Sequence, residues 1–370
     1  MSSISVNTIT DASGGATATI NGYTPTASNM GGKNRIINGD MRIDQRNAGA
    51  SVTFDGSNKY VTDRFFGFSN VGTTTAQQST VAPAGFNNSL LVTQTTGGSV
   101  VSSSYIALQH RVEGFNTADL GWGTASAQTV TLSFWVRSSI TGAFSVALNN
   151  SASNRSYVSN YTINAANTWE QKTITVTGDT SGTWLTNNGL GISLVWNFGY
   201  GSNYTTSTLN SWLGSGAFGS TTATTAFATT SGATWQVTGV QLEAGSVATP
   251  FCPAGGGSYG AELALCQRYC YVGNSDDITS ALAAATTGIY TASKFPTTMR
   301  ANPSATASGS IRISDNYFSD YTASASVTVN NLGVRGGRMF LTGFSGLTVA
   351  RFYSGYDAGT GGKLIFSAEL

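Results

Sequence analysis

Strict alternation of apolar and polar residues is the feature that most limits what this chain can fold into. In "TVTLSFWVRSS", every second residue from Val130 to Val136 is apolar. "FSVALNN" repeats the pattern from Phe144 to Leu148, and "GLGISLVWNF" keeps it from Leu190 to Phe198. Successive side chains of a strand point to opposite faces, so each stretch predicts a strand with one buried face.

Further strands and frequent turn residues extend this pattern to an all-β fold. "KTITVTG" and "WQVTGVQLEAG" add two strands, and Gly239 interrupts the alternation of the second, which predicts a bulge. The 45 glycines, together with abundant serine, threonine and asparagine, favour short strands joined by tight turns. We therefore predict a two-sheet sandwich of the jelly-roll type over residues 33–250.

A charged stretch precedes this region, although only 9% of the chain is charged. "KNRIINGDMRIDQRNAG" follows residues 1–32, whose scattered apolar residues are too few to form a core from one copy. We expect residues 1–32 to form an extended stalk or anchor that is ordered by copies of itself. Charges in the stretch would fix the register where the stalk meets the sandwich and where neighbouring chains meet. The junction candidates are Arg35, Asp40, Arg42, Asp44 and Arg46.

The remainder of the chain predicts a second, smaller β domain. Residues 251–261 are rich in proline and glycine and are expected to form a linker. "AELALCQRYCYVG" then predicts a short helix that runs into a strand near Tyr271, and short strands continue to the end of residues 262–370. Upstream, "YVTDRFFGF" is expected to be one strand that carries Arg64, Phe66 and Phe68 on the same face.

Composition excludes several function classes. The formal net charge of +1 gives no basic field for a nucleic acid, and no apolar run reaches the ~20 residues of a membrane span. The first residues lack the pattern of a secretory signal, which predicts folding in a reducing cytoplasm. Cys252, Cys266 and Cys270 are then expected to be reduced thiols, with no metal site and no cofactor.

Several short sequence segments, taken in their order along the chain, resemble those of a known protein family. They are "NRIINGDMRIDQRNAG", "YVTDRFFGF", "TLSFWVRSSITGAFSVAL", "NTWEQKTITVTGDTSGTW", "GVQLEAGSVATPF", "ELALCQRYCY" and "FPTTMRANPS". From about Lys33 to Pro303 the chain resembles bacteriophage tail fibre and receptor-binding virion proteins, and its central region is similar to a carbohydrate-binding-module jelly roll. The resemblance implies a homotrimeric virion fibre, assembled in the host cytoplasm and attached to other virion proteins through its N-terminus. Its distal C-terminal domain would contact the host.

Sugar binding is the chemistry that the residues favour most. Sugars present apolar C–H faces rimmed by hydroxyls, so their sites need flat aromatic rings beside amides or carboxylates. Trp196 continues an inward-facing run and is expected in the core. The glycan-binding candidates are Tyr200, Tyr204 and Trp212 in the sandwich, and Tyr317, Tyr321, Tyr353, Tyr356 and Asp357 in the C-terminal domain.

The sequence shows no clear pattern of catalytic residues. The lone histidine, His110, shares a strand face with Ile106 and Leu108, as a hydrogen-bonded histidine at a sheet edge would. Asp276 and Asp277 are adjacent, and adjacent side chains of an extended chain point in opposite directions. We therefore expect a non-enzymatic fibre that binds a host surface glycan or lipopolysaccharide. The alternatives are a purely structural capsid-decorating fibre or tail adaptor, and an enzyme that degrades surface polysaccharide.

Overall fold

The computed structural model describes residues 33–315, 319–356 and 361–370. These residues are nearly all β, as the alternation predicted, and they divide into two compact units. The first unit contains residues 33–42, 51–59 and 66–262, and the second contains 43–50, 60–65 and the residues from 263 onward. The predicted stalk at residues 1–32 lies outside the described residues.

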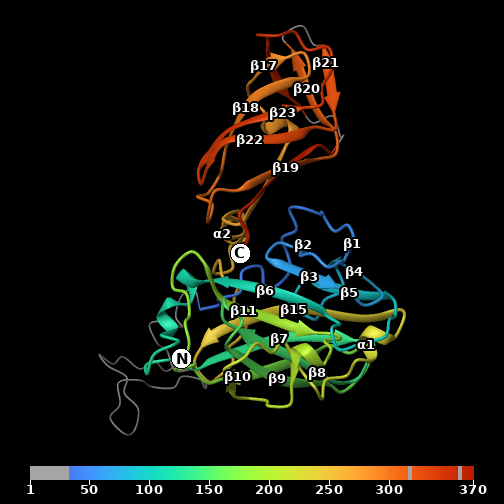
Figure 1. The fold of residues 1–370 in the computed structure, drawn as a ribbon, viewed down its shortest axis with the longest axis vertical. Coiled ribbons are helices and arrows are strands. Elements are labelled where there is room, and N and C mark those ends of the chain that lie inside the picture. Colours follow the sequence, from blue (N-terminus) through green and yellow to red (C-terminus); the bar gives the residue numbers. More distant parts are fainter. Residues whose placement is uncertain (1–32, 316–318, 357–360) are drawn as a thin grey trace, which may run out of the picture. The chain divides into compact units, whose positions relative to one another are not determined.

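The first unit is a jelly-roll-like sandwich of two antiparallel sheets, whose strands run side by side across the unit (Figure 1). The six-stranded sheet has the order β1 (Val52–Thr53), β4 (Thr73–Ser79), β5 (Ser89–Thr96), β15 (Ala233–Ala244), β7 (Val130–Ser138), β10 (Glu170–Val176). The seven-stranded sheet has the order β13 (Trp212–Leu213), β9 (Ser156–Ile163), β8 (Gly142–Asn149), β11 (Leu190–Asn197), β6 (Ile106–Glu113), β3 (Phe65–Ser69), β2 (Lys59–Thr62). Residues 60–65 of this strand order are grouped with the second unit. Smaller elements of this unit are the parallel pair β12 (Thr205–Thr206) and β14 (Gly219–Ser220), and the helices η1 (Gly114–Asn116), η2 (Ala118–Leu120), η3 (Ser202–Tyr204) and α1 (Ala226–Thr229).

The alternating residues form the core between the two sheets. Phe134 of β7 packs edge-on against Trp196 of β11, with ring centroids 5.9 Å apart, and both side chains are fully buried. Trp235 of β15 contacts Trp196 and Phe198 at 6.2 and 4.8 Å. The inward-facing run therefore buries its aromatic residues against the opposite sheet, which confirms the prediction that Trp196 is a core residue.

Two local predictions have different outcomes. Gly239 does form a bulge: the pairing of β15 with β7 shifts register between Thr238 and Gln241, and Gly239 has a φ of +61°. The single strand expected for "YVTDRFFGF" is wrong, because the chain turns at Asp63 and Arg64 between β2 and β3. Arg64 adopts a φ of +71°, which is left-handed and incompatible with a continuous strand.

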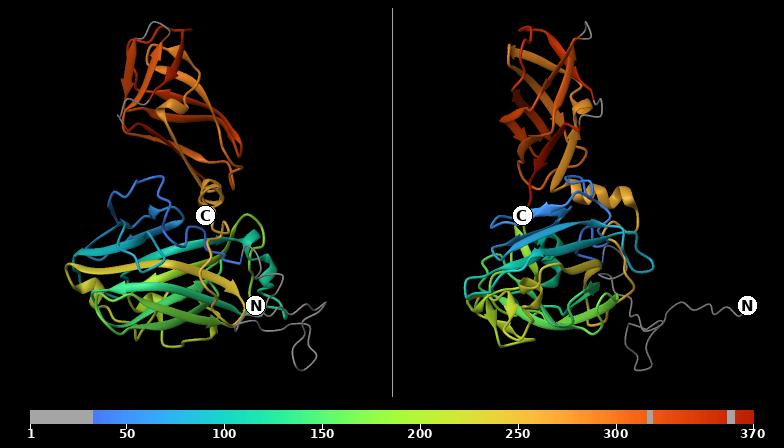
Figure 2. Two further views of the ribbon diagram at one scale, coloured as in Figure 1. Left: turned by 180° about the vertical axis from the view of Figure 1, so that it is seen from behind. Right: turned by 90° about the vertical axis from the view of Figure 1, so that its right-hand side faces the viewer.

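The residues of the second unit from 263 onward, drawn in orange and red in Figure 2, form a smaller β structure. The predicted helix is confirmed as α2 (Tyr259–Gln267), and it leads into β16 (Cys270–Asn274) as expected. Three strands pair in the order β16, β25 (Lys363–Ser367), β19 (Ser304–Ser308), and η4 (Ser275–Asp277) follows β16. A seven-stranded sheet has the order β21 (Asp320–Ala323), β20 (Ile311–Asp315), β24 (Phe352–Gly355), β17 (Ala281–Ala285), β18 (Gly288–Lys294), β23 (Gly336–Thr342), β22 (Ser326–Gly333).

Two upstream segments belong to this second unit, which the sequence does not predict. Residues 43–50 and 60–65 supply Arg46 and Arg64, and both guanidinium groups pair with the carboxylate of Glu369. Arg64 also lies over the ring of Tyr269, 3.6 Å from its centroid. The charges of Arg64 and Arg46 therefore act within the second unit.

The predicted linker at residues 251–261 packs on the first unit. The ring of Phe251 lies 5.2 Å from that of Phe86, and the Cys252 N–H donates to Gln241 Oε1 over 2.9 Å. The carboxylate of Glu262 accepts hydrogen bonds from the N–H groups of Asn38 and Gly255. These contacts fix the segment although its composition resembles that of a loop.

Candidate functional site

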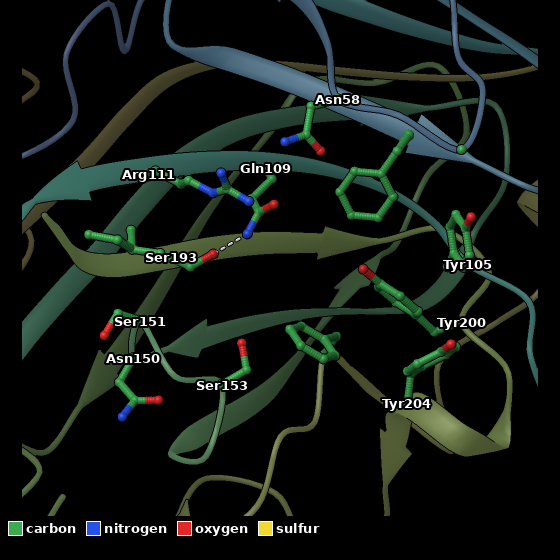
Figure 3. A pocket seen from close by; sticks show the side chains of 14 residues that line it. Asn58, Tyr105, Gln109, Arg111, Asn150, Ser151, Ser153, Ser193, Tyr200 and Tyr204 are labelled. Atoms are coloured by element: carbon green, nitrogen blue, oxygen red, sulfur yellow. Dashed lines mark hydrogen bonds between the residues drawn. The ribbon is translucent and has the colours of Figure 1, made fainter. Parts of the chain in front are cut away.

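A cleft of about 390 Å³ lies on the face of the seven-stranded sheet that points away from the core (Figure 3). On this face Gln109 of β6 and Ser193 of β11 line the cleft, whereas the paired residues Val195, Ala147 and Val158 are buried in a cluster with Tyr200. These positions alternate with core residues such as Leu108 and therefore face outward. Tyr105, Tyr204 and Phe218 pack against these small side chains, which therefore support the aromatic rings.

Aromatic rings form one end of the cleft (Figure 3). Tyr200 stacks on Phe218 with centroids 5.8 Å apart, and Tyr204 meets Tyr200 edge-on at the same distance. Tyr105 contacts Tyr204 at 6.4 Å and Phe68 at 5.8 Å. Tyr200 is buried, whereas the other four rings are half-buried and keep part of their faces accessible. The cluster therefore offers flat apolar surface supported by a buried ring.

The loop that carries Tyr200 and Tyr204 is held by backbone hydrogen bonds. The N–H of Gly201 donates to Ser104 O over 2.9 Å, and that of Asn203 donates to Ser102 O over 3.0 Å. A Cβ at Gly201 would come within 1.9 Å of Val101 O, so only glycine allows this approach. The Phe218 N–H donates to Tyr204 O over 2.8 Å and joins a second loop to the first.

Polar side chains form the other end (Figure 3). Gln109 Nε2 donates to Ser193 Oγ of the neighbouring strand, which orients the amide at the cleft surface. Arg111 lies two residues further along β6 on the same face, with its guanidinium 4.8 Å from the ring centroid of Phe66. Asn150, Ser151 and Ser153 lie across the cleft in the β8–β9 turn.

The hydroxyl group of Tyr200 stays protonated in this setting. Burial, with smaller contributions from Tyr204 and Tyr105, raises the pKa of Tyr200 well above its ordinary value of 10. A neutral phenol can donate one hydrogen bond and also accept one. None of the described residues that line the cleft is an aspartate or glutamate, so these residues lack the carboxylate pair of a glycosidase.

The three glycan-binding candidates of the sandwich lie in two different places. Tyr200 and Tyr204 both line the cleft. Trp212 lies in a separate cluster with Trp122 and Trp184, at ring distances of 5.2 and 5.3 Å. Its indole N–H donates to Thr177 O over 2.7 Å.

The C-terminal candidates that the structure describes lie in different surroundings. Tyr317 and Asp357 lie outside those residues. Tyr353 is buried in the core of the second unit, with Tyr321 packed edge-on against it at 5.4 Å. Tyr356 is half-buried beneath the guanidinium of Arg312, 5.0 Å from the ring centroid. Tyr353 therefore has a packing role.

Each junction candidate has a partner within its own unit of the chain. Arg35 pairs with Asp119 at 2.5 Å, Arg42 pairs with Asp40, and Arg46 pairs with Glu369 at 2.9 Å. The carboxylate of Asp44 accepts the N–H groups of Asn47 and Gly49 at 3.0 and 2.7 Å. These contacts explain the concentration of charge within one chain, and a role between chains stays a prediction.

The residues considered for catalysis have structural roles. His110 is fully buried, with Nε2 3.2 Å from Ile37 O, and β6 is an interior strand, so the expected position at a sheet edge is wrong. Asp277 accepts the N–H of Asn274 over 2.8 Å and caps a short helical turn. In the described part of the chain, no group of three or more histidine, cysteine or acidic residues could hold a metal ion. Nor is any helix there long and apolar enough to cross a bilayer.

The sequence interpretation missed most of the cleft. One usable signal was present in "YIALQHRVEG", where Tyr105, Ala107, Gln109 and Arg111 form the outward half of the alternation that places His110 inside. The cleft residues not predicted are Gly56, Asn58, Phe68, Tyr105, Gln109, Arg111, Asn150, Ser151, Ser153, Leu190, Ser193 and Phe218.

No protein-family model matches this chain, and no curated protein matches its sequence. Similar solved structures include the enzymatically active domain of tailspike protein 4 of bacteriophage CBA120, at a TM-score of 0.31 and 11% identity. That alignment covers 57% of this chain and only 21% of the tailspike chain. A putative sugar binding protein from Bacteroides thetaiotaomicron has a TM-score of 0.30 at 12% identity, with coverage of 58% and 100%. A family 11 carbohydrate-binding module of a Clostridium thermocellum cellulosomal cellulase has a TM-score of 0.27 at 12% identity, with coverage of 54% and 96%.

Proposed function

We propose that this chain is a non-enzymatic virion fibre protein that attaches a bacteriophage to its host by binding a cell-surface glycan, and that the cleft of the sandwich binds this glycan. The observation that carries the proposal is the composition of the cleft. Accessible aromatic faces at one end are continuous with amide, hydroxyl and guanidinium groups at the other. A sugar chain presents the complementary surface, because its rings have apolar faces and hydroxyl rims.

The fixed geometry of the cleft favours binding. Hydrogen bonds hold the Tyr200 loop, and Ser193 holds the amide of Gln109, so little side-chain entropy is left to lose when a ligand binds. Absence of acidic side chains among the described lining residues favours binding without hydrolysis. The proposal therefore locates receptor binding in the sandwich, whereas the sequence analysis expected it mainly in the C-terminal domain.

A glycan array tests this proposal directly. The full chain is applied to immobilised bacterial capsular polysaccharides and lipopolysaccharide O-chains, and each hit is titrated calorimetrically. Tyr204→Ala should weaken binding, and Tyr259→Ala, which changes an exposed tyrosine outside the cleft, should not. An array without hits, or equal affinities of the two variants, would favour the purely structural fibre or tail adaptor. Release of reducing sugar from a bound polysaccharide would show that the protein is an enzyme.

The proposal includes a homotrimer that residues 1–32 order and attach to other virion proteins. Light scattering on the full chain and on a chain that lacks residues 1–32 tests this part. A trimer that dissociates on truncation supports it, and a monomer in both cases contradicts it.

A further inference from the structure

The charge of the residues that line the cleft indicates which kind of glycan it would bind. Among the described residues that line it, Arg111 is the single cation and no side chain is an anion. We propose that the cleft selects an acidic oligosaccharide whose carboxylate binds at Arg111. This inference rests on the proposed function of the same cleft.

The position of Arg111 favours a strong electrostatic interaction between its guanidinium and an anionic ligand. The residue is half-buried on β6, and its guanidinium lies over the buried ring of Phe66. A charge in a partly enclosed site interacts with a ligand more strongly than a charge in open solvent does. The guanidinium is planar, and its N–H groups match the two oxygens of a carboxylate.

Nothing among the described lining residues would repel an anion. The neighbours of Arg111 in the cleft are the amide of Gln109 and the hydroxyl of Ser193, and Asn150 and Ser151 lie opposite (Figure 3). These groups can bind sugar hydroxyls on either side of the carboxylate. The guanidinium of Arg155, which pairs with Asp179 through contacts of 2.6 and 2.7 Å, is not among the lining residues.

Separation of the two ends implies a ligand longer than one sugar. Tyr105 and Arg111 face the same side of one extended segment and are six positions apart, which corresponds to roughly 20 Å. A single ring cannot reach both the tyrosines and the guanidinium. The acidic sugar therefore occupies a different subsite from the sugar that packs on the aromatic end.

Carboxyl reduction provides the test, because it converts an acidic sugar to its neutral counterpart without changing the linkages. Each uronic-acid-containing polysaccharide on the array is compared with its carboxyl-reduced form, and the hits are titrated with the full chain. We expect reduction to weaken binding by about tenfold to a hundredfold, the usual effect of losing a hydrogen-bonded charge pair. Arg111→Gln should abolish this difference, and Arg111→Lys should keep part of it.

The outcomes separate the inference from the proposed function. Glycan binding that is equal before and after reduction, or a preference that persists in Arg111→Gln, would overturn the inference and leave the function intact. Binding only to glycans whose sole anion is phosphate would also overturn it. An array without hits would overturn both. If Arg111→Gln fails to fold, the reduction experiment on the unchanged protein still decides.

Discussion

Tyr200 and Phe218 stack with their ring centroids 5.8 Å apart and their planes inclined by 29°. Both residues line the cleft, but Tyr200 is buried and Phe218 is half-buried, so Phe218 exposes more of its ring to a ligand. Tyr204 packs edge-on against both. We therefore expect Tyr200 mainly to stabilise the folded loop, and Phe218 and Tyr204 mainly to contact the ligand.

Removal of an accessible ring should affect binding more than stability. Tyr204→Ala is expected to lower glycan affinity about tenfold, because a half-buried aromatic ring in a cleft contributes strongly to binding. Tyr200→Ala removes a buried aromatic ring and should cost about 3–5 kcal/mol of unfolding free energy. Calorimetric titration and denaturant unfolding of both variants check this division. The opposite pattern, with Tyr204→Ala the less stable variant, would assign the supporting role to Tyr204.

Gly201 should be intolerant of even one additional carbon. A Cβ there would lie 1.9 Å from Val101 O and 2.5 Å from Ser102 O, so Gly201→Ala must displace the loop that carries Tyr200 and Tyr204. We expect a loss of about 1–3 kcal/mol in stability, as for other overpacked sites, together with weaker glycan binding. Gly214→Ala is the matched control, since its Cβ would meet nothing closer than 3.9 Å. Equal melting temperatures of the two variants would contradict the expectation.

The sandwich was predictable because its signal is local. Alternation from Val130 to Val136 and from Leu190 to Phe198 predicts which face of each strand is buried, whatever the strand pairs with. Leu190 is an exception, because β11 shifts register before Ile192 and Leu190 lines the cleft. The turn at Arg64 was not predictable in the same way. A non-glycine residue there adopts a left-handed conformation, and its guanidinium pairs with Glu369, which is distant in sequence.

The cleft was only partly predictable because it depends on strand order. Tyr200 and Tyr204 stand in one aromatic segment and were visible as a local cluster. Gln109 and Ser193 come together only because β6 pairs with β11, and no local pattern states that pairing. Phe218 lies beside the tyrosines because its N–H donates a hydrogen bond to Tyr204 O, which joins the two loops.

Asp63 should make the stability of the C-terminal unit depend on pH. Burial raises its pKa to about 6, although Arg46 and the hydrogen bonds from Gln45 oppose this change. Between about pH 4 and pH 6 the folded state therefore holds a proton that the unfolded state has released, so the unfolding free energy falls as the pH rises.

Asp63→Asn should remove this contribution, because the amide does not titrate. Denaturant unfolding at pH 4, 5, 6 and 7 measures the slope for both proteins, and the difference between them should approach about 3 kcal/mol over the range. Parallel curves for the two proteins would show that Asp63 does not titrate in this window.

The pairing of Glu369 with two arginines should be among the strongest polar contributions to the stability of the C-terminal unit. The side chains of Arg64 and Glu369 are only 2% and 7% exposed, and Arg46 also pairs with Glu369. Glu369→Ala leaves both cations without this carboxylate and should cost about 3–5 kcal/mol, since loss of one partner of a buried ion pair is strongly destabilising. The exposed pair of Lys59 and Asp55 provides the control, and Lys59→Ala should leave the midpoint of unfolding unchanged. Unfolding curves of Glu369→Ala and Lys59→Ala that coincide with the wild type would show that burial of the Glu369 pairs adds nothing to stability.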